Sequence, residues 1–395
     1  MKTFPSIVCI LGVLFLTAFG GSARAAENTQ AAITIGVLEN QNYAFAAMMK
    51  GSFNLSLEMI NAKGGINGHP VQLAFANDGG QKMEGIKAVK YLIRDQKAVM
   101  LVGGYSSSNT IYMAQTAESM DKPFLVCTAA DDRITQRTMK NIYRLNPPAN
   151  EYATGLEDLL IREIKPTSMA IIYENSPYGT SGAMRMMWFC RDNDIEITAI
   201  IPYHKERAGA EYFQRLIKPI RLNQPQVIYM VSYMKDGVEL VKQIREAKID
   251  SLLTGGAGGF THPDFIKRTG DASRHFLTAT LWSADQQHDL AGEYAALYRA
   301  KHQQSPDYHG AEAYSALMVA VDALKRSQTF AAQDIRAALD QTNLRTPFGP
   351  VQFKAYGKYE RQNSRSTLVL QNIENNYECI WPEDLSVAKF VMPAR

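Results

Sequence analysis

Residues 99–109 read Val-Met-Leu-Val-Gly-Gly-Tyr-Ser-Ser-Ser-Asn, an apolar strand followed by two glycines and then by serines where a helix begins. The free N–H groups of a helix's first turn carry partial positive charge, and glycine lets the backbone approach a ligand closely. Such a turn is suited to a small anion or a carboxylate. Serine is also a common helix N-cap without any ligand, so the turn alone favours a simple cap. Its interpretation depends on the rest of the chain.

Short strand-like runs alternate with helical stretches throughout the chain, and this alternation predicts parallel, doubly wound sheets of an α/β fold. The first series of predicted strands is 33–38, 71–76, 98–102 and 124–127, separated by helices at 45–60, 83–95 and 107–120. A second series follows Pro147 and Pro148, with strands at 169–173, 195–202, 227–231 and 251–254 and helices at 151–163, 179–192, 211–222 and 237–247. Two such series in 395 residues indicate two domains of ordinary size.

The first 25 residues have the pattern of a secretory signal peptide. Lys2 precedes an apolar run at 7–19, and Ala23-Arg24-Ala25 supplies a small-x-small cleavage site. The run is shorter than the ~20 residues that a transmembrane helix needs, and no later segment approaches that length. We therefore expect an exported, soluble chain without a lipid anchor.

The composition excludes several classes of function. Removal of residues 1–25 leaves 40 basic and 39 acidic residues, so no concentrated basic charge indicates nucleic-acid binding. Three widely spaced cysteines remain, Cys127, Cys190 and Cys379; they form no disulfide framework, although one bridge among them stays open. The seven histidines lack metal-ligand spacing, so we expect no metal and no cofactor. Neither a Gly-x-Ser-x-Gly elbow nor a pair of suitably spaced carboxylates points to an enzyme.

Four motifs occur in a characteristic order: Ile60-Asn61-Ala62-Lys63-Gly64-Gly65-Ile66-Asn67-Gly68, Val102-Gly103-Gly104-Tyr105-Ser106-Ser107-Ser108, Asn175-Ser176-Pro177-Tyr178-Gly179 and Ala311-Glu312-Ala313-Tyr314. With them the chain resembles, over about residues 33–353, the type I periplasmic solute-binding proteins of ABC transporters, in the branched-chain amino acid and amide (Leu/Ile/Val-binding protein-like) family. The resemblance implies two doubly wound, Rossmann-like lobes joined by a three-strand hinge, a Venus flytrap. It implies lobe 1 at 27–146 plus 281–346 and lobe 2 at 147–280 plus 347–395, with crossovers near 147, 280–283 and 346–350.

The resemblance also implies a set of ligand-binding residues. In the family, a serine in the strand-to-helix turn of the first lobe holds the ligand's carboxylate, and Ser107 stands at that position. A second loop of the same lobe contributes backbone groups and a threonine hydroxyl, and aromatic residues of the second lobe close over the ligand. The expected set is Tyr43, Tyr105, Ser106, Ser107, Thr128, Ala129, Asp131, Tyr178, Tyr233, Ala257 and Trp282.

One departure from the family bears on the ligand. Family members that bind amino acids carry a glutamate for the ligand's ammonium group where this chain has Ala257, inside Gly255-Gly256-Ala257-Gly258-Gly259. A buried ammonium without a counter-charge costs several kcal/mol. Either Asp131 compensates, or the ligand has no amino group. The expected tyrosines favour the second interpretation, an aromatic or apolar carboxylate.

The sequence therefore predicts a periplasmic binding protein, not an enzyme, that captures a small carboxylate, amino acid-like or aromatic, between its lobes. Hinge rotation closes the lobes, and an ABC transporter permease at the inner membrane is the expected partner. The protein is expected to be a monomer that binds no nucleic acid. Two alternatives remain open: a ligand-sensing module for a membrane signalling partner, because the fold does not decide the partner, and, more weakly, an exported enzyme that uses the same cleft.

Overall fold

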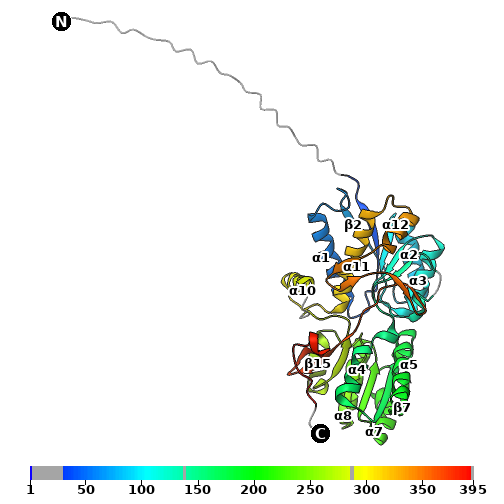
Figure 1. The fold of residues 1–395 in the computed structure, drawn as a ribbon, viewed down its shortest axis with the longest axis vertical. Helices are drawn as coiled ribbons and strands as arrows, with labels where there is room; N and C mark the ends of the chain where they lie inside the picture. Colours follow the sequence, from blue (N-terminus) through cyan, green and yellow to red (C-terminus); the bar gives the residue numbers. More distant parts are fainter. Residues whose placement is uncertain (2–29, 137–138, 285–288, 393–395) are drawn as a thin grey trace.

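The computed structural model describes Met1 and residues 30–136, 139–284 and 289–392, so the predicted signal peptide lies, apart from Met1, outside the described residues. Two seven-stranded sheets build two lobes, which lie one above the other in Figure 1. None of the helices in the described ranges has the length and apolar character needed to cross a bilayer. The predicted fold class of two α/β lobes is confirmed.

The first sheet has the order β13-β14-β5-β4-β3-β1-β2. Its strands are β1 (Ile33–Glu39), β2 (Val71–Asn77), β3 (Met100–Gly103), β4 (Phe124–Val126), β5 (Ile142–Arg144), β13 (Lys354–Tyr356) and β14 (Tyr359–Gln362). The helices of this lobe are α1 (Ala46–Ala62), α2 (Lys82–Arg94), α3 (Ser107–Ser119), α10 (Asp289–His302), α11 (Tyr308–Arg326) and α12 (Ala332–Asp340). Side chains alternate across the strands: Val37 joins the core that contains Phe53 of α1, whereas Leu38 joins the core that contains Val89 of α2. Both faces of the sheet are therefore buried.

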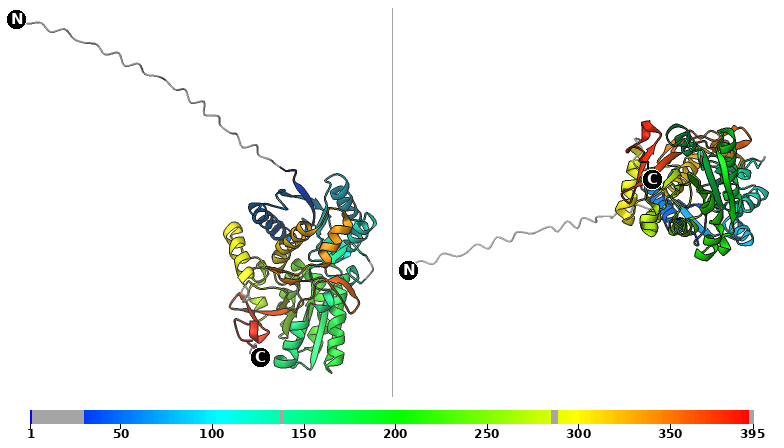
Figure 2. Two further views of the ribbon diagram at one scale, coloured as in Figure 1. Left: turned by 45° about the horizontal axis from the view of Figure 1, so that its top comes forward. Right: turned by 90° about the horizontal axis from the view of Figure 1, so that it is seen from below.

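The second sheet has the order β16-β15-β10-β9-β8-β6-β7. Its strands are β6 (Ser168–Glu174), β7 (Glu196–Tyr203), β8 (Val227–Val231), β9 (Leu252–Gly255), β10 (Leu277–Thr280), β15 (Leu368–Ile373) and β16 (Asn376–Trp381). The helices are α4 (Thr154–Leu159), α5 (Pro177–Asp192), α6 (Ala210–Leu216), α7 (Lys218–Asn223), α8 (Met234–Glu246) and α9 (Asp264–Thr269). A short pair, β11 (Leu344–Thr346) and β12 (Gly349–Val351), stands apart from both sheets. Both views in Figure 2 show α10, in yellow, on the same flank as the red C-terminal strands.

Two features differ from the sequence-based prediction. Residues 354–362, expected in the second lobe, form β13 and β14 of the first sheet, where Gln362 pairs with Arg144 of the unpredicted strand β5. The chain thus makes its third crossing after residue 362, not near 346–350. In addition, the predicted helix 211–222 is divided into α6 and α7 at Ile217, because Pro219 has no N–H to continue the first helix.

The three crossing segments are tied together by hydrogen bonds. Asn363 donates through Nδ2 to the carbonyl of Leu145 at 3.0 Å, and Arg365 donates through Nε to the carbonyl of Leu281 at 2.6 Å. Cys127, Cys190 and Cys379 are all buried and no disulfide joins them, so the bridge that the sequence left open does not form.

A buried carboxyl in the second lobe predicts how stability depends on pH. Asp236 of α8 is only 7% exposed, and burial raises its pKa to about 6, against a smaller lowering by the hydroxyl of Tyr203. A raised pKa means that the folded chain holds this proton more tightly than the unfolded chain. The contribution of Asp236 to the free energy of unfolding is therefore favourable at low pH, and it is lost as the pH rises from about 4 to about 6.

We expect Asp236→Asn to raise the free energy of unfolding above pH 6 by about 2 kcal/mol, because the amide keeps an acceptor for Tyr203 without a buried charge. Urea unfolding between pH 4 and 8 measures the difference. Asp250→Asn, at an exposed carboxyl of the same lobe, is the matched control and should leave the profile unchanged. Parallel profiles for Asp236→Asn and the parent would contradict the prediction.

Candidate ligand-binding site

The turn after β3 is built on two glycines with left-handed backbone. Gly103 has φ +109° and Gly104 has φ +84°, a region that L side chains rarely adopt. The turn brings Gly104 N–H to the carbonyl of Leu38 at 3.1 Å, and α3 starts at Ser107 immediately afterwards. Ser106 is the N-cap residue, but its side chain makes no capping hydrogen bond. The backbone of the turn, and not the Ser106 hydroxyl, therefore sets the start of α3.

Ser107 links this turn to the next loop of the first lobe. Its Oγ accepts hydrogen bonds from the backbone N–H groups of Ala130 and Asp131, both at 3.1 Å. A hydroxyl has two acceptor lone pairs and one donor. Because both lone pairs are used, the O–H of Ser107 is left to donate, as a carboxylate ligand requires.

The loop that carries Thr128 and Asp131 is held in place by internal contacts. Thr128 donates through Oγ1 to the carbonyl of Gly104 at 3.0 Å, and Ala129 donates its N–H to the same carbonyl. The carboxylate of Asp131 accepts from the backbone N–H of Arg133 and from its guanidinium, with Nη2 at 2.6 Å from Oδ2. Asp131 is therefore already paired within its own lobe.

In the second lobe the glycine-rich loop supports Tyr178. The hydroxyl of Tyr178 donates to the carbonyl of Ala257 at 2.7 Å. A Cβ at Gly258 would lie 2.2 Å from that hydroxyl, and one at Gly259 would lie 2.3 Å from the carbonyl of Ser232. The glycines are thus needed for the close packing of this loop, Gly258 against Tyr178 and Gly259 against the backbone of Ser232.

Aromatic rings of the two lobes meet across the cleft. The Tyr43 ring lies 4.6 Å from that of Tyr105 in its own lobe and 5.4 Å from that of Tyr233 in the other, and Tyr233 lies 5.4 Å from Tyr178. Between the lobes they leave a cavity of about 20 Å³, room for about one water molecule. The lining residues are Tyr105, Ser107, Thr128, Ala130, Tyr178, Tyr233, Gly258, Gly259, Tyr308 and His309. An organic ligand can enter only when the lobes separate or these rings turn.

The structure brings five of the predicted residues to this cavity and places the others differently. Tyr43 covers it through its ring contacts, and Ala257 contributes the carbonyl that holds Tyr178. Ser106 and Ala129 lie in the two loops but do not line the cavity.

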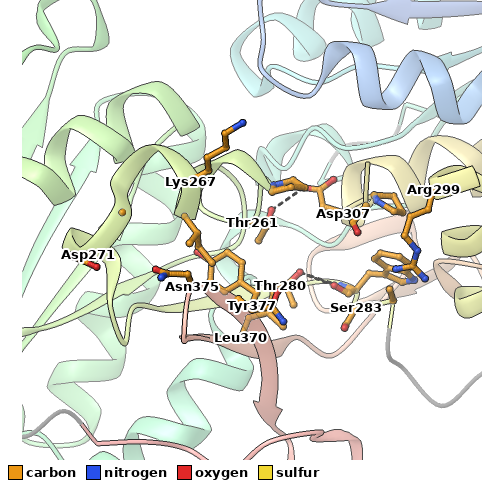
Figure 3. Close-up of a pocket in the computed structure, with 18 residues that line it drawn as sticks. Thr261, Lys267, Asp271, Thr280, Ser283, Arg299, Asp307, Leu370, Asn375 and Tyr377 are labelled. Atoms are coloured by element: carbon orange, nitrogen blue, oxygen red, sulfur yellow. Dashed lines mark hydrogen bonds between the residues drawn. The ribbon is translucent and has the colours of Figure 1, made fainter. Parts of the chain in front are cut away.

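Trp282 lies at a separate place. Its indole donates to the carbonyl of Pro347 at 2.9 Å, and it lines a wider groove of about 810 Å³ on the flank between α9, α10 and β16 (Figure 3). It anchors a crossing segment, so the prediction that it contacts the same ligand as Ser107 does not fit this geometry.

Sequence reasoning missed His309 and Tyr308 at the start of α11. The His309 ring stacks on Phe45 at 3.6 Å, and its Nδ1 lies 2.9 Å from Oδ2 of Asp307. The same carboxylate oxygen accepts from Thr261 of the other lobe at 3.0 Å, the contact drawn between the two residues in Figure 3. The signal in the sequence that points to His309 and Tyr308 is the Ala311–Tyr314 motif, which begins two residues after His309.

No carboxylate is among the described residues that line the cavity. Burial raises the pKa of the phenols of Tyr105, Tyr178 and Tyr233, so these groups are neutral near pH 7. Burial also raises the pKa of Glu312, one helical turn beyond Tyr308, well above its ordinary value, so a negative charge is disfavoured there. In the described part of the chain no cluster of His, Cys, Asp and Glu has the arrangement of a metal site.

Comparison with known proteins agrees with this geometry. The model of a family described as periplasmic binding protein matches residues 32–373. A "Leu/Ile/Val-binding protein homolog 7" of Brucella melitensis is 23% identical over 358 residues, which cover 86% of this chain and 88% of the relative. The chain belongs to the periplasmic binding protein family, and the resemblance predicted from its motifs is confirmed.

Solved structures share the fold at low sequence identity. LivJ from Streptococcus pneumoniae, a branched-chain amino acid transporter substrate-binding protein in complex with isoleucine, superposes with a TM-score of 0.79 at 17% identity, covering 89% of this chain and all of that one. A solute-binding protein of an ABC transporter from R. palustris in complex with benzoate gives 0.78 at 17% identity, covering 88% of this chain and 95% of that one. The two-lobed fold of this chain is thus shared by a protein solved with a bound amino acid and by one solved with a bound aromatic acid.

Proposed function

We propose that this protein captures a small aromatic or apolar carboxylate that lacks an amino group, and delivers it to an ABC importer from the periplasm. The single observation that carries the proposal is the Ser107 hydroxyl, whose two lone pairs accept from Ala130 and Asp131 and whose hydrogen is left to donate. A donor fixed in this way suits the oxygen of an anion.

The absence of an amino group follows from the charges around the cavity. Ala257 stands where amino acid-binding relatives are expected to carry an acid, and Asp131 is already paired with Arg133. Tyrosine rings form most of the remaining wall. An ammonium group would therefore be buried without a counter-charge, at a cost of several kcal/mol, whereas an aromatic or apolar body packs against the rings.

Export and delivery complete the proposal. Residues 1–25 have the pattern of a cleavable signal peptide, and the family consists of periplasmic binding proteins. Closure of the lobes over the ligand presents a form that differs from the open one, and a permease can distinguish the two. We propose a binding role without turnover, with the monomer as the functional unit.

Matched pairs of ligands that differ only in the amino group test the proposal. We expect 3-phenylpropanoate to raise the melting temperature of the ligand-free protein more than phenylalanine does, and 4-methylpentanoate more than leucine. At a hundred times its Kd, a ligand stabilises by about 2.7 kcal/mol, a readily measured shift. Tighter binding of either amino acid than of its deaminated partner would contradict the proposed ligand class. No shift with a broad panel of carboxylates, amino acids and amides would contradict the binding function itself.

A further inference from the structure

Arg144, the last residue of β5, is the largest side chain that is completely buried in the described part of the chain. A guanidinium stays charged in proteins, and a buried charge normally has a partner of opposite charge. Arg144 therefore needs an explanation that packing alone does not give.

Within the described part of the chain, the Arg144 guanidinium donates three hydrogen bonds, all of them to neutral acceptors. Nε donates to Oε1 of Gln362 at 2.6 Å, Nη1 to the carbonyl of Asp131 at 2.7 Å and Nη2 to Oγ1 of Thr135 at 2.8 Å. These contacts hold the side chain in one orientation, but they leave its positive charge uncompensated.

Three carboxylates lie near Arg144, and two of them are paired with other cations. Asp131 binds Arg133, and Oδ2 of Asp132 lies 3.3 Å from Nζ of Lys358. Asp132 is close enough to interact electrostatically with Arg144, yet no ion pair between them occurs among the described residues. The third carboxylate, Glu151, interacts electrostatically with Arg144 and accepts from the hydroxyl of Tyr356 at 3.1 Å. No direct ion pair among the described residues therefore cancels the positive field of the Arg144 guanidinium.

That field acts directly behind the Ser107 site. Arg144 binds the carbonyl oxygen of Asp131, and the N–H of the same residue binds Oγ of Ser107. One residue thus separates the buried cation from the hydroxyl that faces the cavity. Because Arg144 and Ser107 are both buried, the charge is screened less than it would be in water and acts more strongly on an anion at Ser107.

We propose that Arg144 is a positioning residue that makes the Ser107 site selective for anions: it orients the loop at Asp131 and supplies, from behind the cavity wall, the positive charge that a bound carboxylate requires. The inference rests on the proposed function in one respect, namely that an anion binds at Ser107. It explains how the site favours an anion although, in the described part of the chain, neither lysine nor arginine lines the cavity.

A thiol placed at the site measures the field without any ligand. In a Ser107→Cys variant, the Arg144 charge and the two N–H groups should hold the thiol pKa below the value that burial alone would give it. Adding Arg144→Gln should raise that thiol pKa by about one unit, because the thiolate loses the nearby cation. The ultraviolet absorbance of the thiolate reports its titration. The spectrum of the parent protein at each pH is subtracted, which removes the contribution of the buried Cys127, Cys190 and Cys379.

Two companion variants separate charge from structure. Arg144→Lys keeps the charge, so the thiol pKa should stay within a few tenths of a unit of that in Ser107→Cys alone. Thr135→Val removes one hydrogen bond of the same network and leaves the charge, so it should also leave the thiol pKa low. If Arg144→Gln fails to fold, Arg144→Met takes its place, with folding checked by circular dichroism before titration.

Binding of a matched pair then connects the field to selectivity. Arg144→Lys should retain most of the preference for 3-phenylpropanoate over neutral 3-phenylpropanamide, and Arg144→Gln should reduce it about tenfold. The proposal is overturned if the thiol pKa is equal with and without the Arg144 charge, or if Thr135→Val raises it as much as Arg144→Gln. A charge-dependent thiol pKa in a protein that binds no carboxylate would uphold the role of Arg144 and contradict the proposed ligand class instead.

Discussion

Replacement of Gly103 by alanine is expected to lower the free energy of unfolding by about 3 kcal/mol or more. Two costs act together at this residue. The backbone has φ +109°, and a Cβ would lie 2.3 Å from the carbonyl oxygen of Leu38 and 3.1 Å from its backbone N and C atoms. Backbone atoms of a central strand cannot move aside as a flexible side chain can, so the turn itself must shift.

Gly64→Ala is the matched control for the backbone contribution. Gly64 has φ +88°, and a Cβ there would meet nothing within 4 Å. Its cost should therefore be that of the left-handed conformation alone, about 1 kcal/mol. Urea unfolding of both variants measures the difference, and equal losses at the two positions would show that the close approach to Leu38 costs nothing.

The strand-to-helix turns could be predicted because the responsible residues are adjacent in sequence. Gly103 and Gly104 end one strand, Ser107 begins the next helix, and the structure places them accordingly. The same local reasoning failed for β5, since three residues carry no periodicity and this strand depends on pairing with residues far along the chain. The third crossing was misplaced for that reason.

The residues of the candidate site also fall into two groups, those that sequence motifs identify and those that only contacts between distant segments bring to the cavity. Ser107 and Tyr178 follow strands of their own lobes, and the family resemblance of the motifs around them was sufficient to propose them. His309 reaches the cavity through contacts with Phe45 and Asp307, and Arg144 reaches the Asp131 loop through β5. Such contacts between distant segments leave no local pattern. Trp282 illustrates the opposite error, because an aromatic residue at a crossing segment is as easily an anchor as a ligand contact.

Ser107→Ala is expected to weaken binding of an aromatic carboxylate such as 3-phenylpropanoate by about 1 to 3 kcal/mol, a five- to 150-fold increase in Kd. The variant loses the O–H that donates to the ligand and also the acceptor for the N–H groups of Ala130 and Asp131. Isothermal titration calorimetry measures the first loss, and urea unfolding of the ligand-free protein measures the second.

Ser106→Ala is the matched control for Ser107→Ala, since Ser106 is equally buried and its side chain makes no capping hydrogen bond. We expect it to leave Kd within about twofold, which corresponds to the few tenths of a kcal/mol typical of a neutral site. The neutral amide of the same acid separates the two roles of Ser107: an anion gains more than an amide from a donated hydrogen bond. Equal weakening of acid and amide by Ser107→Ala would mean that Ser107 only holds the two loops together, and that the carboxylate is bound by other groups of the cleft.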